Sequence, residues 1–276
     1  MSPGLCDPGG VTAARRPATP TDLLAAALRR SPAAPLVTWY DDASGDRTEL
    51  SATTLANWVA KTANLLQDEF DVAPGSTVTV LLPPHWQTAA VLLGIWSCGA
   101  AVRESPEPDD GGVALVAQDR LAAFEDEGDA DHLDVLGLSL HPLGLGMRDY
   151  TGAARDFALE VRTQGDVFTP WTPLDPAAPG LLLGDGALSL DALTGAAVGL
   201  AERLGLTAGD RVLVGDRLAE EAGPVTWLLA PLAAGASLVL VRQPDPDALA
   251  ARARTEGVTA TLGLRVEGVR QLGATS

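Results

Sequence analysis

Residues 72–102 read VAPGSTVTVLLPPHWQTAAVLLGIWSCGAAV, and residues 206–241 read LTAGDRVLVGDRLAEEAGPVTWLLAPLAAGASLVLV. Each stretch begins with a glycine-containing turn, continues as a short strand and an apolar helix, and ends in a second strand that follows another glycine. The stretches are offset by about 135 residues, which is the scale of a domain repeat. Strand–helix–strand units of this kind predict an α/β protein with mostly parallel sheets flanked by helices.

Shorter elements precede the first unit of the repeat. An apolar stripe of leucine and alanine predicts a helix over residues 21–30. Residues 36–40 and 47–50 are predicted strands, and Gly45 lies in the turn that joins them into a hairpin. A second amphipathic helix is predicted over residues 51–69. We therefore expect helices and a hairpin to pack against the first strand–helix–strand unit.

The chain is predicted to form two lobes with similar architecture. Residues 1–18 are expected to be a disordered arm, residues 19–170 a first α/β subdomain, and residues 181–276 a second, truncated one. The intervening segment, 171–180, is predicted to be a linker because prolines recur in and beside it. These prolines are Pro170, Pro173, Pro176 and Pro179.

The charge balance argues against nucleic acid as a partner. The chain has 36 acidic and 19 basic residues, which gives a formal net charge of −17. A negative field of this size repels nucleic acid and anionic membrane surfaces. The same excess also promotes solubility, so it does not by itself predict a basic partner.

One charge-free run, residues 223–241, is long enough to resemble a membrane span. Pro231, Gly235 and Ser237 divide this run into a short helix, a turn and a strand. We therefore expect no membrane-spanning helix. Cys6 and Cys98 are the two cysteines, and their separation in unlike segments predicts free thiols in a reducing cytoplasm. The amino-terminal residues have no long apolar run, so no signal peptide is expected.

The order of these elements resembles the N-terminal part of the adenylate-forming superfamily, which includes acyl-CoA synthetases, luciferases and peptide-synthetase adenylation domains. Together the two units cover most of residues 21–264. The segments that carry the resemblance are the hairpin at 36–50, Thr54-Leu55-Ala56-Asn57, Val72-Ala73-Pro74-Gly75-Ser76, Leu81-Leu82-Pro83-Pro84, residues 89–102, and residues 193–262 of the second unit. The resemblance implies two pseudo-repeated lobes and a descent from enzymes that activate carboxylic acids with ATP.

The phosphate-binding loop that the resemblance implies is missing. The superfamily has a Ser/Thr/Gly-rich loop with a lysine after a strand at the start of its second subdomain, where backbone N–H groups surround the ATP phosphates. Here the predicted strand at 181–183 leads into Gly184, Asp185 and Gly186, and a helix is predicted from Ser189. Asp185 would place a negative charge where phosphates bind. These three residues are therefore weak candidates for a cofactor site.

Other features of the chain also argue against ligase chemistry. Lys61 is its single lysine, and it is predicted on the polar face of a helix. The resemblance places the remaining nucleotide contacts and the catalytic lysine in parts that follow the second subdomain, so we assign no catalytic residue. Binding of ATP, AMP or CoA has no support from a recognisable motif.

The histidines give one further weak candidate. His85 follows Pro83-Pro84 at a strand-to-helix turn, where α/β sheets usually bind ligands, although a capping histidine is the commoner interpretation. His132 and His141 add no paired spacing typical of metal ligands, so we predict no metal site.

The sequence therefore favours a non-catalytic homologue of AMP-forming acyl-CoA synthetases that acts as a binding or interaction module. We also expect a homodimer or a protein partner. One alternative is a residual or split adenylate-forming ligase, which a groove lined by Gly184, Gly186 and His85 would favour. Another alternative is a sensor that binds an acyl group or a nucleotide without turnover.

Overall fold

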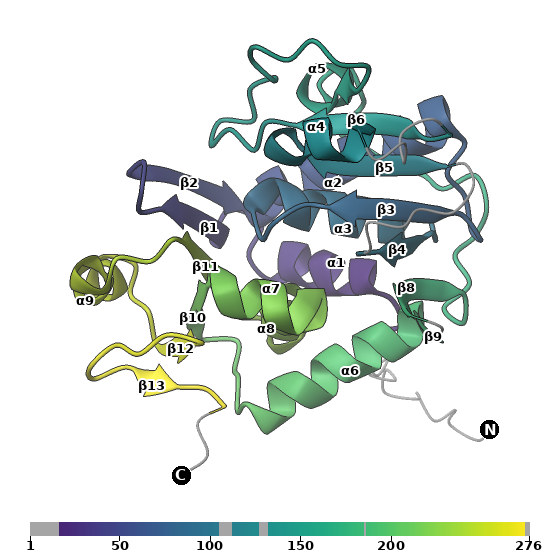
Figure 1. Cartoon of the computed structure of the whole chain (residues 1–276). Coiled ribbons are helices and arrows are strands. Elements are labelled where there is room, and N and C mark those ends of the chain that lie inside the picture. Colours follow the sequence, from purple (N-terminus) through teal and green to yellow (C-terminus); the bar gives the residue numbers. More distant parts are fainter. Residues whose placement is uncertain (1–16, 105–111, 127–131, 185, 274–276) are drawn as a thin grey trace, which may run out of the picture.

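The computed structural model describes residues 17–104, 112–126, 132–184 and 186–273. Most of the arm expected over residues 1–18 lies outside these ranges. The described residues form two mostly parallel sheets flanked by helices, which confirms the predicted fold class (Figure 1). No helix within these ranges is both long and apolar enough to cross a membrane.

The larger sheet has seven strands in the order β7-β6-β5-β3-β4-β8-β9. Neighbouring strands are parallel except for β8 and β9, which form an antiparallel hairpin. The strands are β3 (Thr77–Leu81), β4 (Ala101–Arg103), β5 (Val113–Ala117), β6 (Asp134–Leu138), β7 (Arg155–Asp156), β8 (Pro179–Leu183) and β9 (Gly186–Ser189).

The smaller sheet has six strands in the order β13-β12-β10-β11-β1-β2. Its antiparallel pair is the β1–β2 hairpin, and its other neighbours are parallel. The strands are β1 (Pro35–Asp41), β2 (Asp46–Ser51), β10 (Arg211–Gly215), β11 (Ser237–Arg242), β12 (Ala260–Leu262) and β13 (Arg270–Gln271).

The helices cover and connect these sheets. They are α1 (Pro20–Arg30), α2 (Ala52–Phe70), α3 (Trp86–Ser97), α4 (Gln118–Asp126), α5 (Phe157–Val161), α6 (Leu190–Arg203), α7 (Asp216–Pro224), the π-helical turn η1 (Val225–Leu229), α8 (Ala230–Ala234) and α9 (Pro246–Thr255).

The predicted repeat is present in the structure. In the first unit β3 and β4 are parallel neighbours joined by α3, and in the second unit β10 and β11 are parallel neighbours joined by α7, η1 and α8. Both crossovers end in a glycine with positive φ, Gly99 at 76° and Gly235 at 77°. Glycine adopts this left-handed conformation without the steric penalty of a Cβ atom. The chain can therefore turn sharply from each helix into the following strand.

Strand pairing does not follow the order of the sequence. The β1–β2 hairpin precedes the first repeat unit, yet β1 pairs with β11 in the six-stranded sheet, with Thr38 opposite Val239. The β8–β9 hairpin follows residue 178, yet β8 pairs with β4 in the seven-stranded sheet. The two sheets thus exchange hairpins across the expected linker at 171–180, which joins both lobes through main-chain hydrogen bonds.

Two local predictions are corrected by the structure. The helix expected within the charge-free run at 223–241 does not begin there, because the helical chain starts at Asp216 and is interrupted at Gly223, where φ is 68°. Pro224 cannot donate a backbone hydrogen bond, and the chain continues as the π-helical turn η1. A direct passage from strand 181–183 into the helix was also expected, whereas Gly186–Ser189 forms β9. That strand has neither β-branched residues nor regular alternation, so its sequence gives little sign of it.

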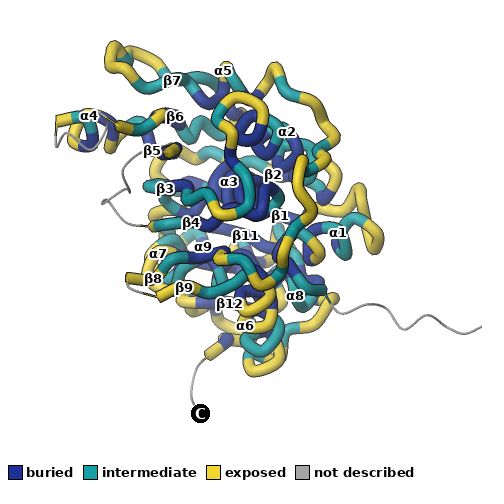
Figure 2. Tube along the Cα trace, turned by 90° about the vertical axis from the view of Figure 1, so that its right-hand side faces the viewer, coloured by how far each residue is buried: buried dark blue, intermediate teal, exposed yellow. Residues whose placement is uncertain are grey.

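Helix α3 lies at the centre of the molecule. Every residue from Trp86 to Trp96 is buried, and Figure 2 shows this helix as a dark blue segment surrounded by other elements. At its far end, the Trp96 Nε1–H donates to the carbonyl oxygen of Gly180 over 2.7 Å and so connects α3 to β8. One continuous apolar core includes side chains from both sheets. Packing on all sides therefore holds the amino end of α3 in place.

Candidate functional site

Strands β3, β5 and β6 end at the edge of their sheet that faces the six-stranded sheet. The segment that follows β3 lies between this edge and the six-stranded sheet. In parallel sheets, ligands usually bind beyond the carboxyl ends of the strands. The segment Pro83-Pro84 contributes to the walls of two cavities at this edge. One cavity extends toward α7, and the other extends toward β1 and α4.

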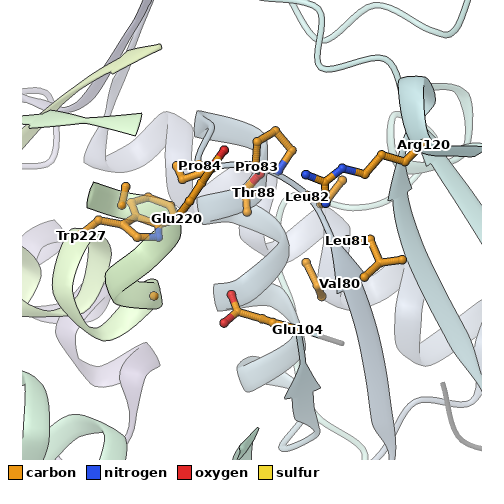
Figure 3. A pocket seen from close by; sticks show the side chains of 12 residues that line it. Val80, Leu81, Leu82, Pro83, Pro84, Thr88, Glu104, Arg120, Glu220 and Trp227 are labelled. Carbon is orange, nitrogen blue, oxygen red and sulfur yellow. Dashed lines mark hydrogen bonds between the residues drawn. The ribbon is translucent and has the colours of Figure 1, made fainter. Parts of the chain in front are cut away.

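The first cavity has a volume of about 280 Å³. Its walls come from the end of β3, the start of α3, the residue after β4, α4 and the α7–η1 segment (Figure 3). The lining residues are Val80, Leu81, Leu82, Pro83, Pro84, Thr88, Glu104, Arg120, Ala219, Glu220, Gly223 and Trp227.

Charged groups are spread around this first cavity. Glu104 extends into it from the end of β4, while Arg120 and Glu220 reach its rim from opposite sides (Figure 3). The carboxyl of Glu104 remains accessible to water within the cavity, but the surrounding protein displaces enough solvent to raise its pKa. Two carboxylates and one guanidinium give the cavity an excess of negative charge.

The second cavity is larger, about 370 Å³, and has more apolar walls. It lies between the Pro83-Pro84 segment, the ends of β5 and β6, and the end of β11. Its lining residues are Trp39, Pro83, Pro84, His85, Gln118, Asp119, Leu138, Ser139, Leu140 and Arg242.

His85 links α3 to the second cavity. Its Nδ1 accepts a hydrogen bond of 3.1 Å from the backbone N–H of Gln87, so His85 is the N-cap of α3. Burial, together with the nearby Arg242 charge, lowers the pKa of His85 to about 3. The ring is therefore neutral at physiological pH. Because Nδ1 is an acceptor, the proton of the neutral ring is on Nε2.

The N–H groups of His85 and Trp39 are both buried, and no residue in the described ranges accepts from them. The side chains of His85 and Trp39 are 2% and 3% exposed. Their rings meet edge to face, with centroids 4.4 Å apart and an interplanar angle of 71°. Neither His85 Nε2 nor Trp39 Nε1 has a hydrogen-bond partner among the described residues. Such groups are rare in folded proteins, and each one left unsatisfied costs about 1 to 3 kcal/mol.

Three other polar side chains of the second cavity have partners. Arg242 Nη1 lies 3.0 Å from Asp41 Oδ2, which neutralises its charge. Gln118 Nε2 donates to the carbonyl oxygen of Arg148, and Ser139 Oγ donates to that of Leu145. Among the described residues of this lining, the donors left without an acceptor are therefore the two ring N–H groups.

Neither cavity has the geometry of nucleophilic catalysis. Thr88 in the first cavity donates its hydroxyl proton to the carbonyl oxygen of Pro83. Ser139 in the second is bound to a backbone carbonyl in the same way. Within the described ranges, neither hydroxyl is hydrogen-bonded to a basic side chain that could activate it. The arrangement is suited to binding a molecule.

The structure separates the weak candidates that the sequence suggested. His85 is both a helix cap and a wall of the second cavity. Gly184 and Gly186 are exposed and line neither cavity, and Asp185 lies outside the described residues. The groove expected between Gly184, Gly186 and His85 is therefore not formed by these two cavities.

The junction between β8 and β9 explains the position of these glycines. Leu183 pairs with Gly186 in the antiparallel register, so two residues connect the strands. Gly184 has a φ of 54°, in the left-handed region typical of tight turns. At the position where the resemblance implies a phosphate-binding loop, the chain has a two-residue hairpin connection.

Lys61 has a structural role. Its Nζ donates to the carbonyl oxygen of Gln164 and lies 3.1 Å from Asp166 Oδ1. It thereby holds the segment around residue 164 against α2. Among the residues with described positions, no group of three or more His, Cys, Asp and Glu side chains could bind a metal ion.

Sequence reasoning missed most residues of the two cavities. Glu104 and Arg242 each follow or end a parallel strand, and this position beyond a strand was the signal that could have identified them. Trp39 is different because it belongs to the hairpin that crosses to the other sheet. Its approach to His85 follows from strand pairing, which the local pattern does not reveal.

No family model matches the chain. It is 46% identical over 253 residues to a "TIGR03089 family protein" of Mycobacterium tuberculosis (strain ATCC 25618 / H37Rv). The match covers 88% of this chain and 99% of that protein.

Solved structures with a similar fold are acyl-CoA synthetases and related ligases. An anthranilate CoA ligase, AuaEII, in complex with anthranoyl-AMP matches with a TM-score of 0.69 and 16% identity, over 89% of this chain and 49% of that one. A Brucella canis acyl-CoA synthetase matches with a TM-score of 0.68 and 15% identity, over 89% and 47%. The N-terminal domain of FACL13 from Mycobacterium tuberculosis has a TM-score of 0.69 and 14% identity, over 89% and 62%. The chain thus spans about half the length of the two ligases, and the likeness shows the fold alone.

Proposed function

The chain belongs to the TIGR03089 family and has the fold of the N-terminal part of acyl-CoA synthetases, and from this premise we propose that it is a non-catalytic binding module. Its ligand is a small molecule that binds at the carboxyl edge of the seven-stranded sheet.

The observation that carries this proposal is the connection between β8 and β9. Two residues join these strands, and the stretch from Gly184 to Ala187 contains no lysine, serine or threonine. A phosphate-binding loop needs several backbone N–H groups and hydroxyls directed at one anion, usually with a cation beside them. A two-residue hairpin connection is too short to surround a triphosphate, so we expect no adenylation by this chain.

The alternative of a split ligase is less favoured for the same reason. A second polypeptide could supply a missing domain, but the connection between β8 and β9 belongs to this chain. The sensor alternative is closer to the proposal because it also requires binding without turnover. Two cavities at the sheet edge, of about 280 and 370 Å³, support a binding role.

A homodimer or a protein partner is a second proposal. Of the five large apolar side chains that are strongly exposed in the described ranges, four lie between residues 143 and 171. These are Leu143, Leu159, Val167 and Trp171. Exposed apolar groups of this kind often mark contact surfaces. Sedimentation velocity over a range of concentrations tests the proposal, and a monomer at every concentration would argue against a homodimer.

The test of the main proposal is ATP–pyrophosphate exchange with a panel of carboxylic acids. An acyl-CoA synthetase measured alongside serves as the positive control, and circular dichroism verifies that the protein is folded. We expect no exchange above the protein-free background with any acid. Acid-dependent exchange that rises with protein concentration would overturn the non-catalytic assignment.

A further inference from the structure

Two residues in the wall of the second cavity, His85 and Trp39, carry ring N–H groups that no described residue accepts from. His85 Nε2–H and Trp39 Nε1–H are buried, belong to rings in edge-to-face contact, and lack an acceptor among the described residues. We propose that this cavity binds an uncharged small molecule that has an apolar body and a carbonyl oxygen, which accepts a hydrogen bond from one or both rings. The inference rests on the binding role proposed above and specifies its ligand class.

The donor on His85 is fixed by the fold. Its Nδ1 is held by the backbone N–H of Gln87, and this contact leaves Nε2 as the protonated nitrogen. Because His85 caps helix α3, whose residues Trp86–Trp96 are all buried, the ring cannot turn without breaking the cap. Burial keeps the ring neutral, so Nε2 is a neutral donor over the physiological pH range. A neutral, preorganised donor suits a carbonyl oxygen well.

The donor on Trp39 comes from the other sheet. Trp39 is in β1, and its neighbours Thr38 and Tyr40 pair with Val239 and Val241 of β11, so its backbone position is set by the sheet. Pro83, Pro84, Leu138 and Leu140 provide apolar surface around the same cavity. A ligand with an apolar body would therefore cover these side chains while its oxygen reaches the rings.

The charges around the cavity favour an uncharged ligand. Arg242 on β11 is paired with Asp41 on β1 at 3.0 Å. Asp119 on α4 adds a negative charge to the lining, and the whole chain carries a net charge of −17. An anion would meet this field without an unpaired cation among the described lining residues to offset it. A cation could pair with the Asp119 carboxylate on α4, but it would leave both ring N–H groups without an acceptor, because both nitrogens are donors.

The test uses ligands that share a benzene ring and differ in one group. Benzamide and acetophenone carry a neutral carbonyl, benzoate is an anion, benzylamine is a cation, and toluene has no polar group. Each is titrated into ¹⁵N-labelled protein, and the signals of the Trp39 indole N–H and the His85 imidazole are followed. We expect saturable shifts of both signals with the two carbonyl compounds, and at least tenfold weaker binding of the other three.

Variants then assign the effect to the donors. Trp39→Phe keeps an aromatic ring against His85 but removes the N–H, and it should weaken benzamide binding about threefold to tenfold, the range of one neutral hydrogen bond. His85→Asn keeps a helix-capping side chain and removes the imidazole donor, and a similar loss is expected. Leu183→Ala changes a strongly exposed apolar residue outside the cavity and outside the 143–171 segment, and is the control. Thermal unfolding of each variant verifies that it is folded.

The outcomes separate this inference from the proposal on which it rests. If toluene or benzoate binds as well as benzamide, or if Trp39→Phe binds benzamide like the unmodified protein, the donor pair is not used and the inference is wrong. It is also wrong if no carbonyl compound binds up to its solubility limit. In either case the absence of ATP–pyrophosphate exchange would still support the non-catalytic role. Conversely, ATP–pyrophosphate exchange activity would overturn the non-catalytic role, whatever the titrations with the benzene compounds show.

Discussion

Replacing His85 by asparagine is expected to reduce the loss of unfolding free energy that the protein shows in mild acid. The folded state holds the pKa of His85 at about 3, against an ordinary value of 6.5, because the ring is buried beside Arg242. The unfolded chain therefore takes up a proton at a pH where the folded chain does not. The contribution of the neutral His85 ring to the free energy of unfolding is fully present above pH 6.5. It is lost as the pH falls from 6.5 toward 3.

The size of the effect follows from these two pKa values. At pH 5 the solution is about 1.5 pH units below the ordinary histidine pKa, and each unit corresponds to about 1.36 kcal/mol. The unmodified protein should therefore lose about 2 kcal/mol of unfolding free energy between pH 7.5 and pH 5 through His85 alone. Asparagine does not titrate, and it preserves a side-chain cap for α3.

The assay is urea unfolding followed by circular dichroism at several pH values between about 7.5 and 5. His85→Asn will be less stable at neutral pH because it loses the ring contact with Trp39, so the informative quantity is the change in the difference between the two proteins. His141→Asn is the matched control. His141 is also a loop histidine whose Nδ1 accepts from a backbone N–H two residues later, but it is only partly buried.

The expected result is that the stability difference between the unmodified protein and His85→Asn narrows by about 2 kcal/mol on going from pH 7.5 to pH 5. The His141→Asn profile should run parallel to that of the unmodified protein. A constant difference between the unmodified protein and His85→Asn across this range would mean that His85 is not held neutral by burial. The assignment of Nε2–H as a fixed donor would then fail as well.

Two further predictions concern helix α3 and its surroundings. Gly94→Ala should destabilise the protein by about 1 to 3 kcal/mol, since the added Cβ would lie 2.8 Å from Thr62 Cγ2. The control is Gly195→Ala in α6, where nothing lies within 4 Å of the added Cβ, and it should stabilise the protein by up to about 1 kcal/mol. Equal effects of the two substitutions in thermal unfolding would contradict the close approach of α2 and α3. Trp96→Phe should lower the unfolding free energy by about 2 to 4 kcal/mol because it leaves the carbonyl oxygen of Gly180 without its 2.7 Å hydrogen bond. A loss below about 0.5 kcal/mol in urea unfolding would show that this bond does not stabilise the contact of α3 with β8.

The local elements of this fold could be predicted from sequence because their signals are local. The repeat was visible in the spacing of turns and apolar runs, and the positive φ of Gly99 and Gly235 explains why each crossover ends in glycine. The β1–β2 hairpin was predicted in the same way. His85 was recognised as a residue at a strand-to-helix turn, and its capping bond is of the local kind that such a turn predicts.

What could not be predicted depends on contacts between distant segments. The exchange of hairpins between the sheets is determined by the pairing of β1 with β11 and of β4 with β8, which periodicity does not encode. The second cavity depends on that exchange, because Trp39 reaches His85 only when β1 joins the other sheet. The helix that precedes Gly223 was missed because residues 216–222 are rich in charge and lie outside the apolar run that begins at Gly223.

The measurement that tests the non-catalytic assignment most directly is calorimetric titration with Mg-ATP, AMP and a non-hydrolysable acyl-adenylate mimic. Protein that circular dichroism shows to be folded is titrated with each compound in turn. The short β8–β9 connection predicts no saturable heat with Mg-ATP, since no loop surrounds the triphosphate. Saturable micromolar binding of Mg-ATP would contradict this account and would show that this chain holds the nucleotide by residues other than a phosphate-binding loop.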